Sequence, residues 1–431
     1  MDKQSQLNRL NTFLWGMPLT NSIARSMYDV AFIWIILDIT NSEQVTGFVA
    51  MTTYLPAIMF GLFVGSIVDL LPKTKVIIRS TILQGLIISF IPLFLFLNKS
   101  SLQEHYIINT IGIFLGPDPQ AILMLAYNIK YVGALMIIAF FHNGFSLPIV
   151  PSFNAYLPTQ ISKDKLLRAN SIANISWQTA VVIGPILAAQ FLTFYPVENL
   201  FIVCVFFYLL ASWFASFVPH DTVENKQVSY KKILKKTKEG LGYLKKQSTI
   251  GFMVLLTFFS NIFVMGPAVV GIPIFVKLYL NGSAADFAMA EAFVGIGMLL
   301  GTAIMYRIGS KFNYGFLFIL GLFIDGISFC LYYFAESLFQ FYIFSFMHGI
   351  GIPFLIIARV SILQNNIKEK FLGRIFSIIS VSIISMTAIS SGIIGILAQF
   401  MDIQSIFMIF GILAGSCGLV GALHPKIRYL N

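Results

Sequence analysis

Among the ionisable side chains that interrupt long apolar runs of this sequence, six form a short list whose types and spacing bear on what chemistry the chain could carry out. A charged group among apolar side chains is costly unless it is paired or hydrated, so each one is a candidate functional residue. They are Arg25, Asp29, Lys130, Glu291, Asp325 and His348.

The clearest arrangement lies near the N-terminus. Asn21, Arg25 and Asp29 are four residues apart, which places them on one face of a helix. Arg25 and Asp29 can neutralise each other there as a structural pair. Alternatively, Asp29 is released when its surroundings change and then binds a proton, since an apolar cavity favours the neutral form of a carboxyl group. Asp29 is therefore the first candidate for a proton carrier.

Two further groups leave alternatives open. Lys130, near Tyr127 and Tyr131, could bind an anionic ligand, pair with Asp29, or extend its stem toward water. His348 carries an imidazole, which titrates near neutral pH, so it could transfer protons or be hydrogen-bonded in the protein interior.

The composition defines the environment of these residues. The chain has 431 residues, of which 57% are hydrophobic and 11% charged, and its mean hydropathy is +0.84. Globular proteins carry roughly 25% charged residues, so this chain is expected to lie in a membrane and not to be a soluble enzyme, a disordered protein or a disulfide-rich secreted domain.

No pattern indicates an enzyme or a cofactor. The three cysteines, Cys204, Cys330 and Cys417, lie in apolar runs without CxxC spacing, so neither a disulfide framework nor a zinc site is expected. The five histidines are scattered, and the sequence contains no G-x-x-x-x-G-K-[ST], H-E-x-x-H or G-x-S-x-G motif. We expect no metal, no cofactor and no direct use of ATP.

Twelve apolar runs are long enough to span a membrane, which takes about 20 residues. They are 10–38, 44–68, 76–97, 121–145, 169–193, 198–218, 249–277, 286–308, 312–334, 338–360, 373–398 and 403–423. The connection 219–248 divides the chain into two six-helix halves, 1–218 and 249–431. Its sequence YKKILKKTKEGLGYLKK fits an amphipathic helix on anionic headgroups or a solvated basic linker.

The positions of the basic residues predict the orientation. With a cytoplasmic N-terminus, 24 of the 28 Lys and Arg residues fall on cytoplasmic segments, and only Lys99 and Lys277 fall on outer loops. This bias predicts a multi-pass protein of the inner (plasma) membrane with both termini in the cytoplasm. The net charge of +10 then reflects topology and gives no reason to expect a nucleic-acid partner.

Three stretches resemble a known family. GLFVGSIVDLLPKTKVIIRS is similar to the signature loop G-x-x-x-D-R-x-G-R-[RK] of the major facilitator superfamily, with Leu70 and Pro72 replacing the usual Arg and Gly. The segment from Pro151 to Ser171 resembles the connection between spans four and five of the enterobactin-exporter and macrolide-efflux branch, and 363–377 resembles the matching connection in the second half. The conformational residues that this resemblance indicates are Gly61, Gly65, Asp69, Lys73, Lys75, Arg79, Gly184 and Pro185.

The resemblance implies a major facilitator fold and, from the G-P-x-x-G-G-like element at Gly184, an exporter. The expected function is secondary active, proton-coupled export of a small amphipathic molecule, either a siderophore or a drug-like compound, by a monomer in contact with membrane lipids. It also implies that Gln178 and Asn261 lie on cavity-lining spans, and that Asp325 has a local structural partner. An uptake permease, a lysophospholipid flippase and a non-transporting receptor or scaffold are the alternatives.

Overall fold

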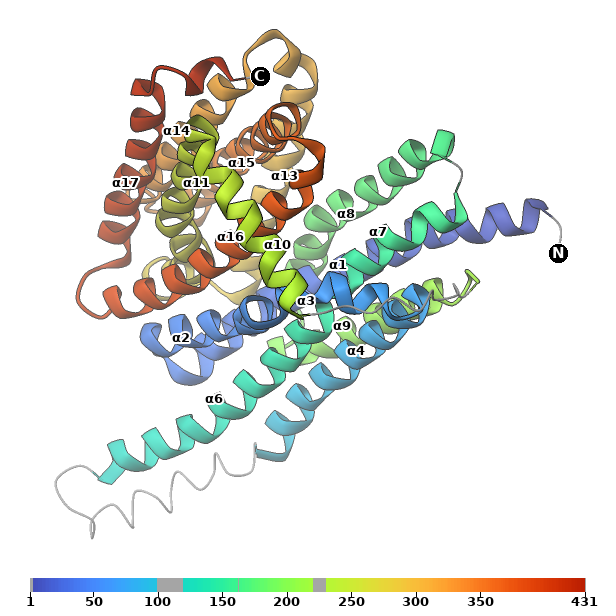
Figure 1. The fold of residues 1–431 in the computed structure, drawn as a ribbon. Coiled ribbons are helices and arrows are strands. Elements are labelled where there is room, and N and C mark those ends of the chain that lie inside the picture. The colour runs from blue at the N-terminus through green and yellow to red at the C-terminus, as the bar shows by residue number, and fades with distance from the viewer. Residues whose placement is uncertain (1–2, 99–118, 162, 220–229, 431) are drawn as a thin grey trace.

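The fold consists of helices joined mostly by short turns. The computed structural model describes residues 3–98, 119–161, 163–219 and 230–430, and no strand occurs among them (Figure 1). Eleven of its helical segments are long and apolar enough to cross a membrane. The 38-residue helix α1 (Lys3–Thr40) adds another, although Arg25 and Asp29 lower its hydropathy. The prediction of a twelve-helix, all-α membrane protein is confirmed.

The N-terminal half brings α1 against two of its neighbours, α8 and α9. Its fourth span is longer than expected, because residues 151–158, predicted as part of a connection, continue it as helix α7 after the break at Pro148. The helices that follow α1 are α2 (Glu43–Thr53), α3 (Leu55–Asp69), α4 (Lys73–Asn98), α6 (Pro119–Ser146), α7 (Ile149–Gln160), α8 (Lys163–Leu192) and α9 (Val197–Ala215).

The C-terminal half follows a helical linker, α10 (Tyr230–Lys246). Its helices are α11 (Ser248–Gly266), α12 (Ile272–Ile274), α13 (Ala284–Ile308), α14 (Tyr314–Tyr332), α15 (Leu338–Asn366), α16 (Glu369–Leu397) and α17 (Ile403–Leu423). Short helical turns are η2 (Pro267–Gly271), η3 (Phe275–Tyr279), η4 (Gly309–Lys311) and η5 (Ile427–Tyr429).

The seventh span is the least regular. The sequence predicts one helix over 249–277, whereas the structure has α11 followed by the π-helical turns η2 and η3 around α12. Pro267 and Pro273 lack a backbone N–H and so interrupt the regular hydrogen-bond ladder. Wide turns of this kind are frequent at functional sites.

Helix starts and turns follow local side-chain chemistry. Asn41 turns the chain between α1 and α2 with a positive φ of 44°, which Asn tolerates better than most residues. The Ser42 hydroxyl then accepts the N–H of Val45 at 3.3 Å and caps α2. Asp402 caps α17, and the hydrogen bonds donated by the Ser405 N–H and hydroxyl hold the pKa of Asp402 below its usual range.

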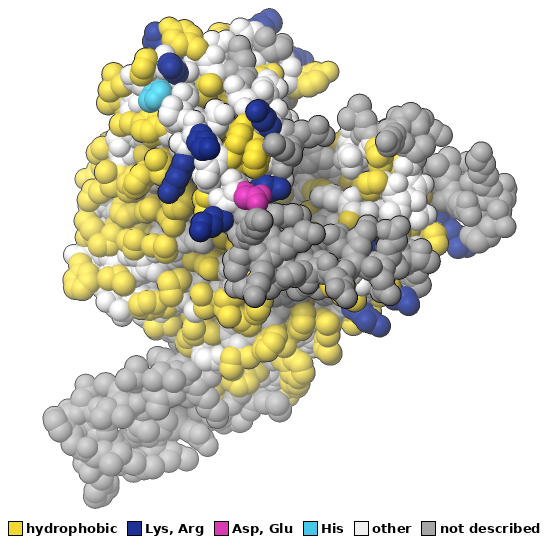
Figure 2. Space-filling view, in the orientation of Figure 1, with side chains coloured by type: hydrophobic (Ala, Val, Ile, Leu, Met, Phe, Trp, Pro, Cys, Tyr) yellow, Lys and Arg dark blue, Asp and Glu magenta, His cyan; other side chains and the backbone are white. Residues whose placement is uncertain are grey.

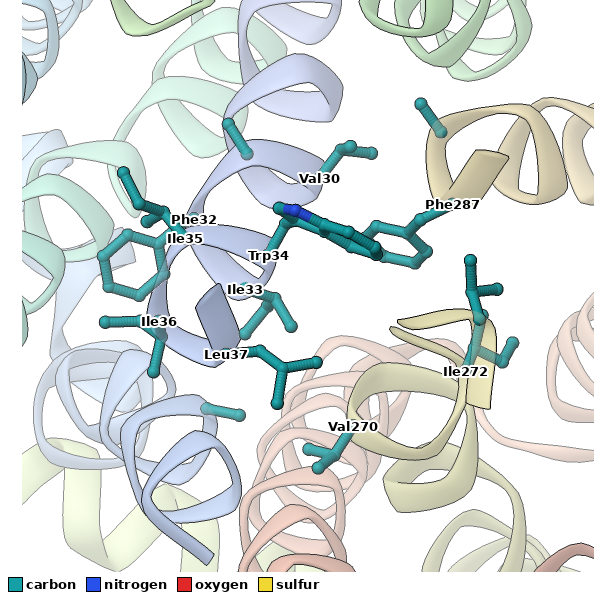
Figure 3. Close-up of a cluster of buried hydrophobic side chains, with 14 of the residues drawn as sticks. Val30, Phe32, Ile33, Trp34, Ile35, Ile36, Leu37, Val270, Ile272 and Phe287 are labelled. Carbon is teal, nitrogen blue, oxygen red and sulfur yellow. The ribbon is translucent and has the colours of Figure 1, made fainter. Parts of the chain in front are cut away.

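The buried apolar side chains form one shared cluster and two separate ones. The largest cluster joins both halves: Trp34 of α1 stacks on Phe287 of α13 with ring centroids 6.1 Å apart, and Val270 and Ile272 of the second half belong to the same cluster (Figure 3). Two further clusters each belong to one half, around Phe153 in the first and around Leu322 in the second. The halves therefore share a core at one end and have separate cores at the other.

Close backbone approach holds the shared end together. Helices α2 and α16 come from opposite halves, and a Cβ added at Gly47 would lie 2.6 Å from the Cα of Gly395. Beside this crossing, the amide of Gln399 donates to Gln44 at 3.0 Å. Only glycine fits here, so the sequence permits tight contact between the two halves at this end.

The opposite end carries the linker helix and many of the basic side chains. The C-terminal part of α10 packs on α16, where Arg374 donates to Glu239 at 2.7 Å and the rings of Tyr243 and Phe371 stack with centroids 4.2 Å apart. In Figure 2, Lys and Arg side chains gather on the upper and right-hand parts of the visible face, whereas the left flank is mostly hydrophobic. This asymmetry matches a membrane-embedded flank and a basic end.

Candidate functional site

A cavity of about 310 Å³ lies between the two halves. Residues of α1, α8 and the α2–α3 junction line it from the first half, and residues of η2 and α13 line it from the second. Its ionisable lining residues are Arg25, Tyr28, Asp29, Tyr54 and Glu291. The cavity therefore places charges of both halves in one enclosure.

Arg25 and Asp29 form the ion pair that their spacing predicts. The Arg25 Nε donates to Asp29 Oδ2 at 2.9 Å. Their side chains are 33% and 53% exposed, so the pair faces the open cavity and is not sealed in the apolar core. Asn21, one turn earlier, is outside the cavity lining, and its Oδ1 is buried without a hydrogen-bond partner among the described residues.

Glu291 faces the same cavity from α13, with no salt bridge to any residue that the structure describes. Apolar side chains surround these charges, among them Phe32 and Ile33 of α1 and Phe287 and Met298 of α13. With both acids ionised, Asp29 and Glu291 carry two negative charges against the single positive charge of Arg25. Among the described residues, one carboxylate therefore lacks a fixed cationic partner in the cavity, and a proton or a ligand cation can occupy that role.

Asp325 and His348 pair with each other away from this cavity. Their side chains are each 4% exposed, and Asp325 Oδ1 lies 3.2 Å from His348 Nδ1. The contact is close enough for an ion pair, but its angles do not fit a hydrogen bond. The ring of Phe329 packs edge-on against His348, with centroids 5.0 Å apart. The local partner expected for Asp325 is thus His348, which the sequence treats as a separate candidate.

Asn261 and Gln178 do not line the cavity. The Asn261 amide donates to Thr257 of its own helix at 2.7 Å, and Gln178 lies on α8 outside the lining. Lys130 lies on α6, but its side chain is outside the described residues. The suggested pairing of Lys130 with Asp29 therefore stays a prediction.

The residues of the signature loop are described only in part. Gly61 of α3 faces α16, where a Cβ would lie 3.7 Å from Val381. Gly65 and Asp69 belong to the end of α3 whose side chains are outside the described residues, and Lys73 begins α4. The charge lock expected of Asp69 stays untested.

The element at Gly184 and Pro185 has a clear structural role. A Cβ at Gly184 would lie 2.7 Å from the Cβ of Ser26, so glycine permits α8 to pack tightly on α1. Pro185 lines the cavity. This close contact fixes α8 beside the Arg25–Asp29 pair.

Two polar clusters escape sequence reasoning. A hydrogen bond of 2.9 Å joins His142 Nε2 and the Tyr208 hydroxyl, and the His142 ring lies 3.8 Å from that of Tyr28. Lys277, expected on an outer loop, donates to Asp38 at 2.8 Å across the two halves. The first cluster could have been found from the sequence, because His142 lies inside an apolar run. The sequence around Lys277 gives no sign that it bonds to Asp38.

A twelve-helix membrane protein whose halves enclose a charged cavity belongs to the class of helical membrane transport proteins. The chain is a member of the Major Facilitator Superfamily, whose family model matches residues 14–280 and 254–428.

Named relatives include efflux proteins. The chain is 21% identical to Macrolide efflux protein A of Streptococcus pyogenes over 426 residues, covering 97% of this chain and 96% of that protein. It is 23% identical to the Multi-drug resistance efflux pump PmrA homolog of Lactococcus lactis, covering 59% and 62%. The resemblance to the macrolide-efflux branch is therefore confirmed.

A solved structure shares the fold. A bacterial homologue of the iron transporter ferroportin, in an inward-facing state, has a TM-score of 0.74 at 15% identity over 97% of this chain and 99% of that chain.

Proposed function

We propose that this chain exports small amphipathic molecules through the central cavity, in exchange for protons. The observation that carries this proposal is the placement of Asp29 and Glu291 from opposite halves, together with Arg25, in one cavity with apolar walls. Apolar walls suit a hydrophobic body, and a carboxylate without a fixed partner suits a proton or a cationic group.

Competition between a proton and a cationic cargo for that carboxylate would couple proton entry to cargo export. A proton neutralises the acid and disfavours a cationic cargo, whereas departure of the proton restores the site for cargo. Since Arg25 already neutralises one acid by its bond to Asp29, the balance in the cavity changes with a single proton. In the described arrangement the acid without a salt bridge is Glu291. Asp29 stays the leading proton carrier, because a change in the cavity that breaks its bond to Arg25 leaves its carboxylate free to bind a proton.

The direction and the first cargo follow from the relatives. Their names record macrolide efflux and multidrug efflux, so we infer export and place drug-like compounds before siderophores as test cargo. The proposed setting is the plasma membrane with both termini in the cytoplasm, as the distribution of Lys and Arg predicts.

The test uses purified protein in liposomes with an imposed pH gradient and a radiolabelled macrolide as the probe. Asp29→Asn should abolish gradient-driven transport, while Asp402→Asn, a carboxylate replaced at an exposed helix cap, should keep it. Both variants should insert and fold like the parent protein. Full gradient-driven transport by Asp29→Asn would rule out the proton-carrier assignment, and macrolide accumulation in energised cells would favour an uptake permease.

A further inference from the structure

A second cavity, of about 240 Å³, lies beside α4 and is separate from the central one. Val68 of α3, the α3–α4 turn, the first turns of α4 and Pro148 before α7 enclose it. These elements belong to the end of the molecule that the Lys and Arg distribution places at the cytoplasm. We call this cavity the α4 groove.

Two cations line the α4 groove side by side. Lys75 and Arg79 are four residues apart on α4, hence on one face, and both side chains are exposed. Neither forms an ion pair with another described residue. Two adjacent cations on one helix face repel each other, and an external anionic ligand relieves that repulsion. The planar guanidinium of Arg79 suits a phosphate in particular.

A buried hydroxyl completes the polar part. Ser80 is only 6% exposed and lines the same groove. Its placement next to Arg79 gives the groove a hydrogen-bond donor for the same anion.

The other walls are apolar and extend into the membrane. Leu71 and Leu83 are both partly exposed, and Pro148 closes the groove from the α7 side. At 1.5 Å rise per residue, Leu83 lies about 12 Å further along α4 than Lys75. In the predicted orientation, a groove of this length would extend from the headgroup level into the hydrocarbon of one leaflet. A free phosphate ion would leave this apolar part without a contact.

We propose that the α4 groove binds one anionic phospholipid of the cytoplasmic leaflet, with its phosphate at Lys75, Arg79 and Ser80. The glycerol and the start of an acyl chain lie against Leu71 and Leu83. The proposal rests on the predicted orientation but not on the export function, because lipid binding is measured without transport. Since the groove joins α3, α4 and the α6–α7 junction, the bound lipid stabilises their packing.

The test measures lipid retention by native mass spectrometry of the full chain in detergent, with added dioleoylphosphatidylglycerol or dioleoylphosphatidylcholine. The parent protein should retain one phosphatidylglycerol in preference to phosphatidylcholine and gain thermal stability from it. Lys75→Gln with Arg79→Gln should weaken this binding by about thirtyfold, as expected for two cations near a membrane surface.

A matched control removes the same charge elsewhere at the same end. Arg307→Gln with Lys311→Gln replaces two exposed cations at the end of α13, and binding should stay within about twofold of the parent. Equal loss in both double variants would show general surface attraction and overturn the proposal. So would equal retention of the two lipids by the parent protein, a comparison that needs no variant to fold. Displacement of the lipid by millimolar inorganic phosphate would assign the groove to a free anion.

Discussion

Replacing Lys277 with methionine should weaken closure of the end of the molecule that the distribution of Lys and Arg predicts to be the outer one, called the outer end below. Lys277 comes from η3 in the second half, and its Nζ donates to three oxygens of the first half: Asp38 Oδ1 at 2.8 Å, the Leu37 carbonyl at 3.2 Å and Asn41 Oδ1 at 3.3 Å. Methionine keeps an apolar stem of similar length but removes all three bonds, together with the contact of Nζ with the Trp34 ring, whose centroid lies 5.9 Å away. The variant therefore tests the polar contacts between the halves without creating a cavity.

The expected magnitude follows from exposure. A hydrogen bond to a charged group contributes about 1.5–3 kcal/mol when buried, and an exposed ion pair about 0–1 kcal/mol. The Lys277 side chain is 16% exposed, but that of Asp38 is 56% exposed, so screening by water reduces the total. We expect the loss of these contacts to disfavour the outer-closed state by about 1.5 kcal/mol, which is a factor of about ten in the equilibrium between the outer-closed and outer-open states.

The measurement is a distance distribution between spin labels at two exposed outer-end positions, one on each half. Asn199 at the start of α9 and Phe339 at the start of α15 are suitable. Lys277→Met should raise the outer-open population about tenfold, and Lys277→Arg should preserve the parent distribution. Once Lys277 is replaced, Asp38→Asn should add little, because the two residues act as one pair. Identical distributions for Lys277→Met and the parent would refute the reasoning.

Three more outcomes follow from the contacts of other residues. His348→Phe leaves Asp325 buried without its partner and should lower the free energy of unfolding by about 3 kcal/mol. Thermal unfolding should show that the double variant Asp325→Leu with His348→Phe loses less stability than His348→Phe alone. An equal or larger loss in the double variant would contradict the pairing. Gly395→Val should open the outer end, because a Cβ there would lie 2.7 Å from the Cα of the facing glycine in α2; unchanged spin-label distances would contradict this. The folded-state pKa of Asp402 is depressed, so the stability that Asp402 gives to the start of α17 is present above about pH 4 and is lost as pH falls through the folded-state pKa. Hydrogen exchange in the first turn of α17 should show this loss of stability. Asp402→Asn should remove the pH dependence.

Much of the fold could be predicted because hydropathy is a local property. Apolar runs gave the long helices and their order, and spacing by four residues gave the bond between Arg25 and Asp29, which lie on one helix. The irregular seventh span was missed although its signal was present. Counting apolar residues passes over Pro267 and Pro273, yet proline removes a backbone donor whatever the hydropathy of its neighbours.

The relations between distant helices could not be predicted in the same way. Asp325 and His348 lie on α14 and α15, and periodicity on either helix does not show that the two side chains face each other. Lys277 and Asp38 are 239 residues apart, so their bond depends on how the halves pack. That packing rests on close approach at glycines such as Gly47, which look alike in the sequence whether they meet another helix or lipid.

The position of the charges explains how a cavity between two halves could respond to its contents. Asp29 and Arg25 lie on the first half and Glu291 on the second. When the two halves move relative to each other, the distance between the two acids changes, and so does the amount of water that surrounds them. Excluding water from an uncompensated carboxylate is unfavourable, which opposes closure around an empty, ionised cavity. A proton or a cationic cargo removes that penalty, and the halves then close around it. In the proposed mechanism, the same carboxylate that binds a proton or cargo therefore also decides when the cavity can change the side to which it opens.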